Sequence, residues 1–89
     1  MDVVHSRCAG LDVHQATVVA TVRVPAENRS CHVVTQTFGT VTTDLPALRD
    51  WLQAYGVTHV ALESTGVYWR PVYYVLEDAF PLLLINIRS

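Results

Sequence analysis

The chain has 89 residues, of which six are basic and eight acidic, so its formal net charge is −2 at pH 7 with histidine neutral. Because 51% of the residues are hydrophobic and 16% are charged, the composition predicts one packed domain, or part of one, and excludes an intrinsically disordered chain. The charge balance also excludes a nucleic-acid-binding domain that relies on bulk positive charge, and all six basic residues are arginines, which bind phosphates at a few fixed positions.

The first part of the chain predicts three β-strands. Residues 8–14 alternate in side-chain character with a period of two, which is typical of a strand with one buried face. The same period continues over residues 17–24, and a third β-rich segment covers residues 31–38. Because the connections are short and the second one contains the turn-forming residues 25–30, these segments predict an antiparallel meander.

The pattern then changes to that of a helix. Apolar residues at helical spacing run from Leu45 to Tyr55, after a potential N-cap at residues 42–44. Gly56 is expected to stop this helix, because glycine readily adopts the left-handed conformation that follows a helix end. Trp51 and Tyr55 share the spacing of the leucines and are expected to belong to the core.

Two further strands are expected in the last third of the chain. Residues 57–63 predict a buried strand. A second helix is expected from near Pro71 to about Ala79, and Pro81 is expected to end it. Residues 82–87 predict the last strand.

This order of elements restricts the fold. Each strand that follows a helix is expected to lie parallel to the first strand, with a right-handed crossover. The result is an α/β fold with a mixed five-stranded sheet in the order 3-2-1-4-5 and helices packed on it, which is the ribonuclease-H-like arrangement. The last helices of that fold are missing, so we expect residues 1–89 to form a single partial domain, truncated after strand 5, with one sheet face thinly covered.

Cysteine content and hydropathy suggest where the protein acts. Cys8 and Cys31 form no CxxC pair and are expected to be free, buried thiols in a reducing compartment. The N-terminus lacks the apolar segment of a signal peptide, and the longest apolar stretch, residues 81–85, is too short to span a membrane. We therefore expect a cytoplasmic protein without membrane contact.

Two carboxylates lie in otherwise apolar strands, Asp12 and Glu63. Acidic residues are seldom buried without a partner, and in the predicted topology both approach the carboxyl end of neighbouring parallel strands. Two adjacent carboxylates repel each other unless a cation lies between them, and Mg²⁺ or Mn²⁺ suits oxygen ligands. In the alternative, Asp12 accepts backbone N–H bonds and Glu63 caps the turn or the helix that follows it. Spacing alone leaves both interpretations open.

Other residues are candidates for contact with nucleic acid. His14 lies two residues beyond Asp12 on the same face, where it could reach a phosphate or the carboxylate. Tyr68, Trp69 and Arg70 place two aromatic rings beside a cation, a combination that stacks on bases and binds phosphate. The structural alternative is that Trp69 packs on the sheet and Arg70 is solvated.

Taken together, several motifs resemble the N-terminal catalytic domain of insertion-sequence transposases of the IS-one-ten class, which includes the Piv-type DNA invertases. The resemblance runs from about residue 9 to residue 87, nearly the whole chain. The motifs that carry it are Gly10-Leu11-Asp12-Val13-His14, Phe38-Gly39-Thr40, Asp44-Leu45 with Trp51-Leu52, and Glu63-Ser64-Thr65-Gly66-Val67-Tyr68-Trp69. Among these motifs, the run from Glu63 to Trp69 is the one that is specific to the family.

The resemblance implies a function. Members of this family are similar to RuvC resolvases, with an Asp-Glu-Asp-Asp tetrad that binds Mg²⁺ on a ribonuclease-H-like fold. The match makes Asp12 the first catalytic, metal-binding acid and Glu63 the second. It also implies metal-dependent DNA cleavage and strand transfer, DNA as the partner, a homo-oligomer and, in the full-length parent, a guide RNA from the element.

The sequence departs from the family pattern in two ways. Gln15 stands where a basic residue is common, and the third and fourth acids are expected beyond Ser89, as is a second domain with a serine implicated in strand exchange. We therefore expect the parent to be a transposase and this fragment to be inactive alone. Alternatives are a non-catalytic oligomerisation or DNA-binding remnant and, less favoured because no glycine follows Asp12, an actin-like nucleotide-binding fragment.

Overall fold

The computed structural model describes residues 7–26, 30–40, 44–64 and 66–86. Five strands and two helices follow one another in the predicted order. Their bounds are β1 Cys8–Val13, β2 Thr17–Pro25, β3 Cys31–Gly39, α1 Asp44–Ala54, β4 His59–Ser64, α2 Trp69–Leu76 and β5 Leu82–Asn86. The part of the predicted N-cap at residues 42–43 lies outside the described residues.

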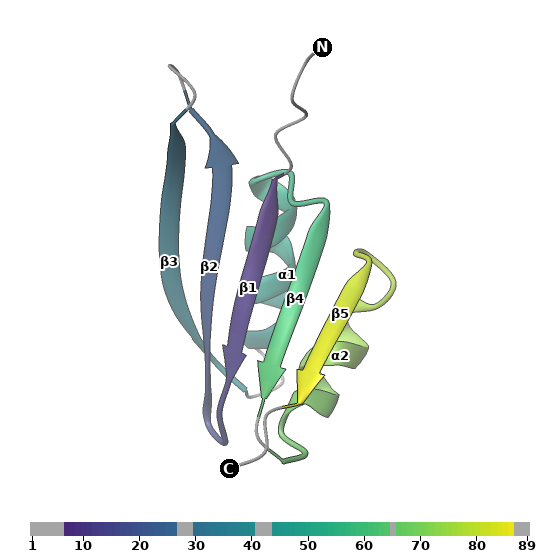
Figure 1. Cartoon of the computed structure of the whole chain (residues 1–89). Helices are drawn as coiled ribbons and strands as arrows, with labels where there is room; N and C mark the ends of the chain where they lie inside the picture. Colours follow the sequence, from purple (N-terminus) through teal and green to yellow (C-terminus); the bar gives the residue numbers. More distant parts are fainter. Residues whose placement is uncertain (1–6, 27–29, 41–43, 65, 87–89) are drawn as a thin grey trace.

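The strands form a single mixed sheet in the order β3-β2-β1-β4-β5, as predicted. The pairs β1–β2 and β2–β3 are antiparallel, and the pairs β1–β4 and β4–β5 are parallel. Figure 1 shows both helices behind the sheet, with α1 behind β1 and β4 and α2 behind β5. The opposite face carries no helix among the described elements, and we call it the open face. The predicted thinly covered face is confirmed.

The core lies between the sheet and the two helices. Alternate residues of β1, β2 and β4 point into it, and α1 and α2 each bury one apolar side. The fully buried side chains include Leu11, Val13, Val18, Val22, Leu48, Leu52, Leu62, Val72 and Leu76. Trp51 and Tyr55 are half-buried against this core, with Trp51 edge-on to both Phe38 and Tyr55. The predicted inward faces of the strands and of α1 are therefore confirmed.

Hydrogen bonds close the hairpin between β1 and β2 tightly. The His14 amide donates to the Thr17 carbonyl oxygen at 2.8 Å. Thr40, which follows β3, stabilises this hairpin with two hydrogen bonds. Its amide donates to the Ala16 carbonyl oxygen, and its hydroxyl donates to the Gln15 carbonyl oxygen. The carboxyl end of β1 is thus held in place, and with it the residues that we assign to the site.

Two element boundaries differ from the prediction. The strand predicted over 57–63 begins at His59, because the Val57 amide donates to the Leu52 carbonyl oxygen at 3.2 Å and so belongs to the end of α1. The second helix begins at Trp69 rather than near Pro71 and ends at Leu76. A proline in the first turn of a helix is tolerated, because the amide groups there lack intrahelical partners.

The structure corrects one expectation about the cysteines. Cys8 and Cys31 are free, but the prediction that both are buried was wrong, since Cys31 is exposed and Cys8 only half-buried. Cys31 begins an edge strand whose outer residues face solvent. Among the described residues, neither helix has the length and apolar character needed to cross a bilayer.

Gly56 ends α1 in the left-handed conformation, with φ of 68°. A Cβ atom added there would also lie 3.3 Å from the Arg7 side chain, whose guanidinium donates to the Tyr55 carbonyl oxygen. We expect Gly56→Ala to lower the free energy of unfolding by about 1–2 kcal/mol. Urea unfolding would measure this, with Gly10→Ala as control, because a Cβ at Gly10 meets nothing within 4 Å. Equal stability of the two variants would contradict the prediction.

Candidate metal and nucleic-acid site

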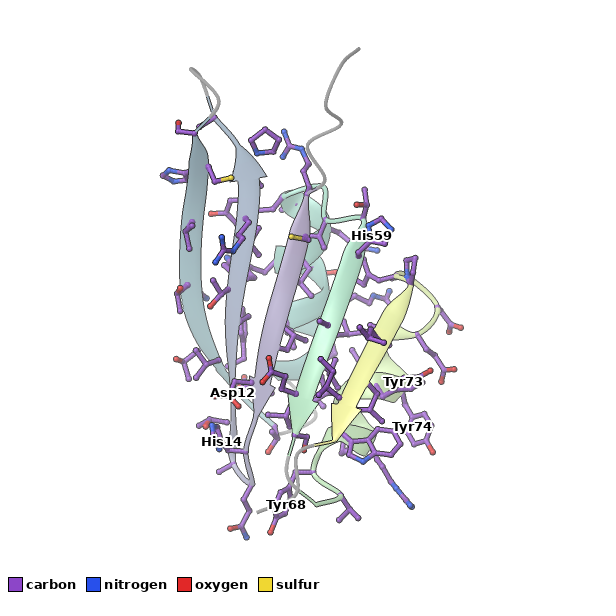
Figure 2. The ribbon with its side chains drawn as sticks, viewed as in Figure 1. Asp12, His14, His59, Tyr68, Tyr73 and Tyr74 are labelled. Atoms are coloured by element: carbon purple, nitrogen blue, oxygen red, sulfur yellow. The ribbon has the colours of Figure 1, made fainter. Side chains whose placement is uncertain are left out.

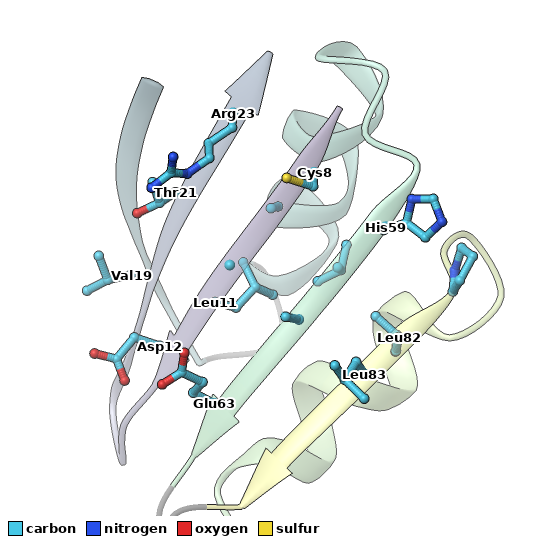
Figure 3. Close-up of a pocket in the computed structure, with 15 residues that line it drawn as sticks. Cys8, Leu11, Asp12, Val19, Thr21, Arg23, His59, Glu63, Leu82 and Leu83 are labelled. Atoms are coloured by element: carbon cyan, nitrogen blue, oxygen red, sulfur yellow. The ribbon is translucent and has the colours of Figure 1, made fainter. Parts of the chain in front are cut away.

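Asp12 and Glu63 face each other across two neighbouring strands. In the parallel register of β1 and β4 they are direct partners, so their Cα atoms lie about 4.8 Å apart, the usual spacing between strands. Their neighbours in each strand are buried, which directs both carboxylates to the open face. Figure 3 shows the two carboxylates near the carboxyl ends of the strands, as the sequence predicted.

Both carboxylates are exposed, which corrects the reason for which they were singled out. The Asp12 side chain is 61% exposed, and Glu63 is also exposed. Desolvation therefore does not demand a counter-charge at this site. The structural alternative loses support as well, because within the described ranges no backbone N–H donates to either carboxylate.

His14 is the polar neighbour of Asp12. Its Nε2 atom lies 3.2 Å from Asp12 Oδ2, and both side chains are more than half exposed. Such an exposed contact contributes little to stability. It does hold an imidazole beside the carboxylate pair, where it can orient Asp12 or contact a bound phosphate.

The chemistry of the carboxylate pair fits a hard divalent cation. Two oxygen-donating groups on adjacent strands suit Mg²⁺ or Mn²⁺. In the part of the chain that the structure describes, no three His, Cys, Asp or Glu side chains come together as a metal site. Two carboxylates alone would leave most of the coordination sphere of Mg²⁺ to water.

A groove of about 800 Å³ runs along the open face from this carboxylate pair. We call it the open-face groove; its floor is formed by the small, directly paired residues Gly10 and Ala61. Arg23 and His59 lie at its other end, in the same register row as Cys8. Sequence reasoning did not assign a role to Arg23. The signal was present, because in β2 the alternation that buries Val18, Ala20 and Val22 directs Arg23 to the face of Asp12.

The aromatic candidates lie on and before α2. Trp69 is half-buried against the core and makes an edge contact with Tyr73, which agrees with the structural alternative, in which Trp69 packs on the sheet. Arg70 is exposed, with its Cζ atom 5.7 Å from the centre of the Trp69 ring. Tyr68 is 40% exposed, and Figure 2 shows it at the same end of the sheet as Asp12 and His14. His59 lies at the opposite end.

Comparisons with known proteins identify the fold. No family model matches the chain. A search of curated proteins also finds no match. Among solved structures, the chain is similar to Thermus thermophilus RuvC in complex with a Holliday junction, with a TM-score of 0.65, 13% identity, and coverage of 92% of this chain and 65% of that one.

Two other solved structures are also similar to this chain. A fowlpox virus resolvase bound to Holliday junction DNA has a TM-score of 0.62 and 10% identity, covering 90% of this chain and 60% of that one. An exopolyphosphatase from Cytophaga hutchinsonii has a TM-score of 0.60 and 13% identity, covering 91% and 34%. The chain thus spans less than two thirds of each of these structures. At such identities the comparisons show the ribonuclease-H-like, RuvC-like fold.

Proposed function

We propose that this chain is the N-terminal part of the catalytic domain of a DNA transposase or recombinase of the IS-one-ten and Piv class, and that its full-length parent cleaves and joins DNA strands with a divalent metal. The observation that carries the proposal is the direct pairing of Asp12 with Glu63 at the carboxyl ends of β1 and β4, on the open face. The RuvC-like fold and the sequence motifs support it. In this proposal the protein acts on DNA in the cytoplasm, as a homo-oligomer, and an RNA guides the full-length parent.

Asp12 and Glu63 would hold the cation between them. A bound Mg²⁺ or Mn²⁺ supplies polarisation of a phosphate and charge stabilisation during its displacement. Two features of this chain would position the cation. The hydrogen bonds of Thr40 to the β1–β2 hairpin fix the end of β1, and His14 orients the Asp12 carboxylate. Because two carboxylates bind Mg²⁺ weakly, we propose that this chain alone does not cleave DNA.

A nucleotide-binding role of the actin-like kind is less well supported. That function needs free backbone amides and small residues after the first strand to cradle phosphate. Here the turn consists of His14, Gln15 and Ala16, and the His14 amide already donates to Thr17. The similarity to an exopolyphosphatase therefore supports the fold alone.

A non-catalytic oligomerisation module is the second candidate. It is favoured by β5, an edge strand whose Leu83 and Ile85 side chains are 62% and 41% exposed. Apolar side chains on an uncharged edge strand favour pairing with another chain. Light scattering after gel filtration would show self-association, and self-association without metal-dependent DNA binding would favour this candidate over the transposase.

The transposase proposal predicts that Mg²⁺ increases the affinity of the chain for DNA. Asp12 and Glu63 would hold the metal, whose positive charge would offset theirs and attract a DNA phosphate, so we expect several-fold tighter binding of a four-way DNA junction with Mg²⁺ than with EDTA. Fluorescence anisotropy would measure this, and the labelled strands should remain intact. The double variant Asp12→Asn/Glu63→Gln should show no effect of Mg²⁺.

The matched control is Asp50→Asn/Glu77→Gln, which removes one exposed acid from α1 and one from the end of α2. This control should respond to Mg²⁺ like the original chain. A response to Mg²⁺ that is equal in the Asp12→Asn/Glu63→Gln variant would contradict the proposal. Cleavage that depends on Mn²⁺ and on Glu63 would show instead that the chain is active alone.

A further inference from the structure

The strand β3 forms one edge of the sheet, on the far side from β5 (Figure 1). It pairs with β2 in an uninterrupted register over its whole length. Most of its side chains are exposed, and only Phe38 is buried. Residues 31–39 contain no lysine, arginine, aspartate, glutamate or proline, and their register has no bulge. This edge therefore lacks the features with which proteins usually prevent pairing with another strand.

Hydrogen bonds at the two ends of the β2–β3 pairing show which way the backbone groups of β3 point. The Ala26 amide donates to the Ser30 carbonyl oxygen, and the Thr40 amide donates to the Ala16 carbonyl oxygen. In an antiparallel ladder, such hydrogen-bonded pairs alternate with pairs that form no hydrogen bonds to each other. The even-numbered residues of β3 therefore bond to β2, and the odd-numbered residues direct their amide and carbonyl groups to the outer edge.

Two further contacts agree with this alternation. The Thr21 and Thr35 hydroxyls lie 3.3 Å apart, as expected for a pair without backbone hydrogen bonds, in which side chains are closest. The Gly39 amide donates to Asp44 Oδ2 at 3.2 Å, so the outer edge is already occupied at this odd-numbered residue. In the described part of the chain, no second strand pairs with the outward amides of Cys31, Val33, Thr35 and Thr37.

We propose that β3 pairs with β3 of a second copy of this chain, antiparallel and about a two-fold axis, so that one continuous sheet runs through both copies. The register that fits is centred on Val34. It places Cys31 opposite Thr37 of the second copy, and Val33 opposite Thr35 of the second copy. All the outward amide and carbonyl groups of residues 31–37 are then hydrogen-bonded, and Gly39 keeps its bond to Asp44.

The chemistry of this edge favours a second copy as its occupant. Because residues 31–39 carry no formal charge, two copies approach without like-charge repulsion, whereas a charged segment would find no counter-charge there. In the proposed register Val34 also lies opposite Val34 of the second copy, on the face of the sheet that carries the helices, since its partner in β2 is the buried Val22. Such β-branched pairs stabilise antiparallel strands.

The pairing takes place in the plane of the sheet, so it does not depend on what lies over either face. It gives an interface to the homo-oligomer of the proposed function, and it does not involve Asp12 or Glu63.

Light scattering after gel filtration tests the dimer. A chain loaded at about 0.1–1 mM should give twice the mass of one copy, since a small interface forms a weak dimer. We expect Val33→Pro to raise the dissociation constant of the dimer at least about 10-fold, because proline removes an outward amide. The bonds from β3 to β2 do not use this amide, so the fold should be retained, as a circular-dichroism melt would verify. The matched control, Val33→Ala, keeps the amide and should retain the dimer.

Disulfide cross-linking tests the register without a variant that disrupts the edge. In a Cys8→Ser/Cys31→Ser background, Val34→Cys should give a disulfide-linked dimer on a non-reducing gel after mild oxidation. The reason is that the two Val34 Cα atoms would lie about 4.5 Å apart, which suits a disulfide. Gln36→Cys is the matched control, since it lies on the same face of β3, but the two Gln36 Cα atoms would be about 13 Å apart along the strands. It should not cross-link.

Several results would overturn the inference. A chain that stays monomeric up to about 1 mM would do so, as would equal dimerisation of Val33→Pro and Val33→Ala. Loss of the dimer in Leu83→Lys, with Val33→Pro unaffected, would place the interface at β5. Equal cross-linking of Val34→Cys and Gln36→Cys would contradict the proposed register.

The proposed function and this inference fail separately. The double variant Asp12→Asn/Glu63→Gln should dimerise like the original chain, because neither residue lies on β3. If the chain dimerises through β3 but its binding of DNA does not respond to Mg²⁺, the interface stands and the metal site is wrong. If a monomeric chain responds to Mg²⁺ through Asp12 and Glu63, the metal site stands and the interface is wrong.

Discussion

Replacing Leu62 with alanine is expected to lower the free energy of unfolding by about 2–5 kcal/mol. Leu62 lies in the middle of β4, a strand paired on both sides, and its side chain is 0% exposed between the sheet and the helices. Truncation removes buried apolar surface and leaves a cavity, because the paired strands cannot move inward to fill it. A domain of this size has a total stability of only about 4–13 kcal/mol, so a large fraction of the variant should be unfolded at moderate urea concentrations.

Leu83→Ala is the matched control for this prediction. It makes the same chemical change one strand away, but Leu83 lies on the open face and is 62% exposed. Its free energy of unfolding should change by less than about 0.5 kcal/mol. Equilibrium urea unfolding followed by circular dichroism would measure both. A similar loss in the two variants would mean that the open face is covered in solution, for example by another copy of the chain.

Removing both acids of the carboxylate pair is expected to abolish binding of Mn²⁺. Isothermal titration of Mn²⁺ into the original chain should show one weak site, with a dissociation constant on the order of millimolar, since two exposed carboxylates leave most ligand positions to water. The double variant Asp12→Asn/Glu63→Gln should show no heat beyond dilution. It preserves side-chain size, and both positions are exposed, so loss of binding would not reflect loss of the fold.

The single variants Asp12→Asn and Glu63→Gln sharpen this test. If one ion is shared, each single variant should lose most of the binding, and the two losses should not add, as expected for groups that act on one ligand. Losses that add independently would indicate two separate weak sites. The Asp50→Asn/Glu77→Gln control should bind like the original chain, and a loss there would show that the binding is nonspecific.

The positions of the two acids could be predicted from the sequence without any side-chain geometry. Alternation in residues 8–14 places Asp12 opposite to Leu11 and Val13, and the parallel pairing of the first and fourth strands follows from the order of elements. The right-handed crossover rule also implies the open face, because the steps from β1 to β4 and from β4 to β5 run in the same direction across the sheet. Both connecting helices must therefore cover the same side.

The argument from burial nevertheless failed for these acids. An apolar sequence context around Asp12 and Glu63 reflects the buried neighbours on the helix side, and it does not report the environment of the acids themselves. The sequence supports the pairing of the two acids, whereas their high exposure is a property of the assembled layers. The metal-binding role is for that reason a proposal that rests on their juxtaposition.

The order of the elements, the strand order of the sheet, the inward faces and the end of α1 at Gly56 follow from the sequence alone, because these features depend on local periodicity, backbone conformation and handedness. Where β4 and α2 begin depends instead on the tertiary structure. These features depend on contacts between distant segments, such as the hydrogen bond from the Thr58 amide to the Arg7 carbonyl oxygen. Local sequence patterns do not predict such contacts, because the two segments are far apart in the chain.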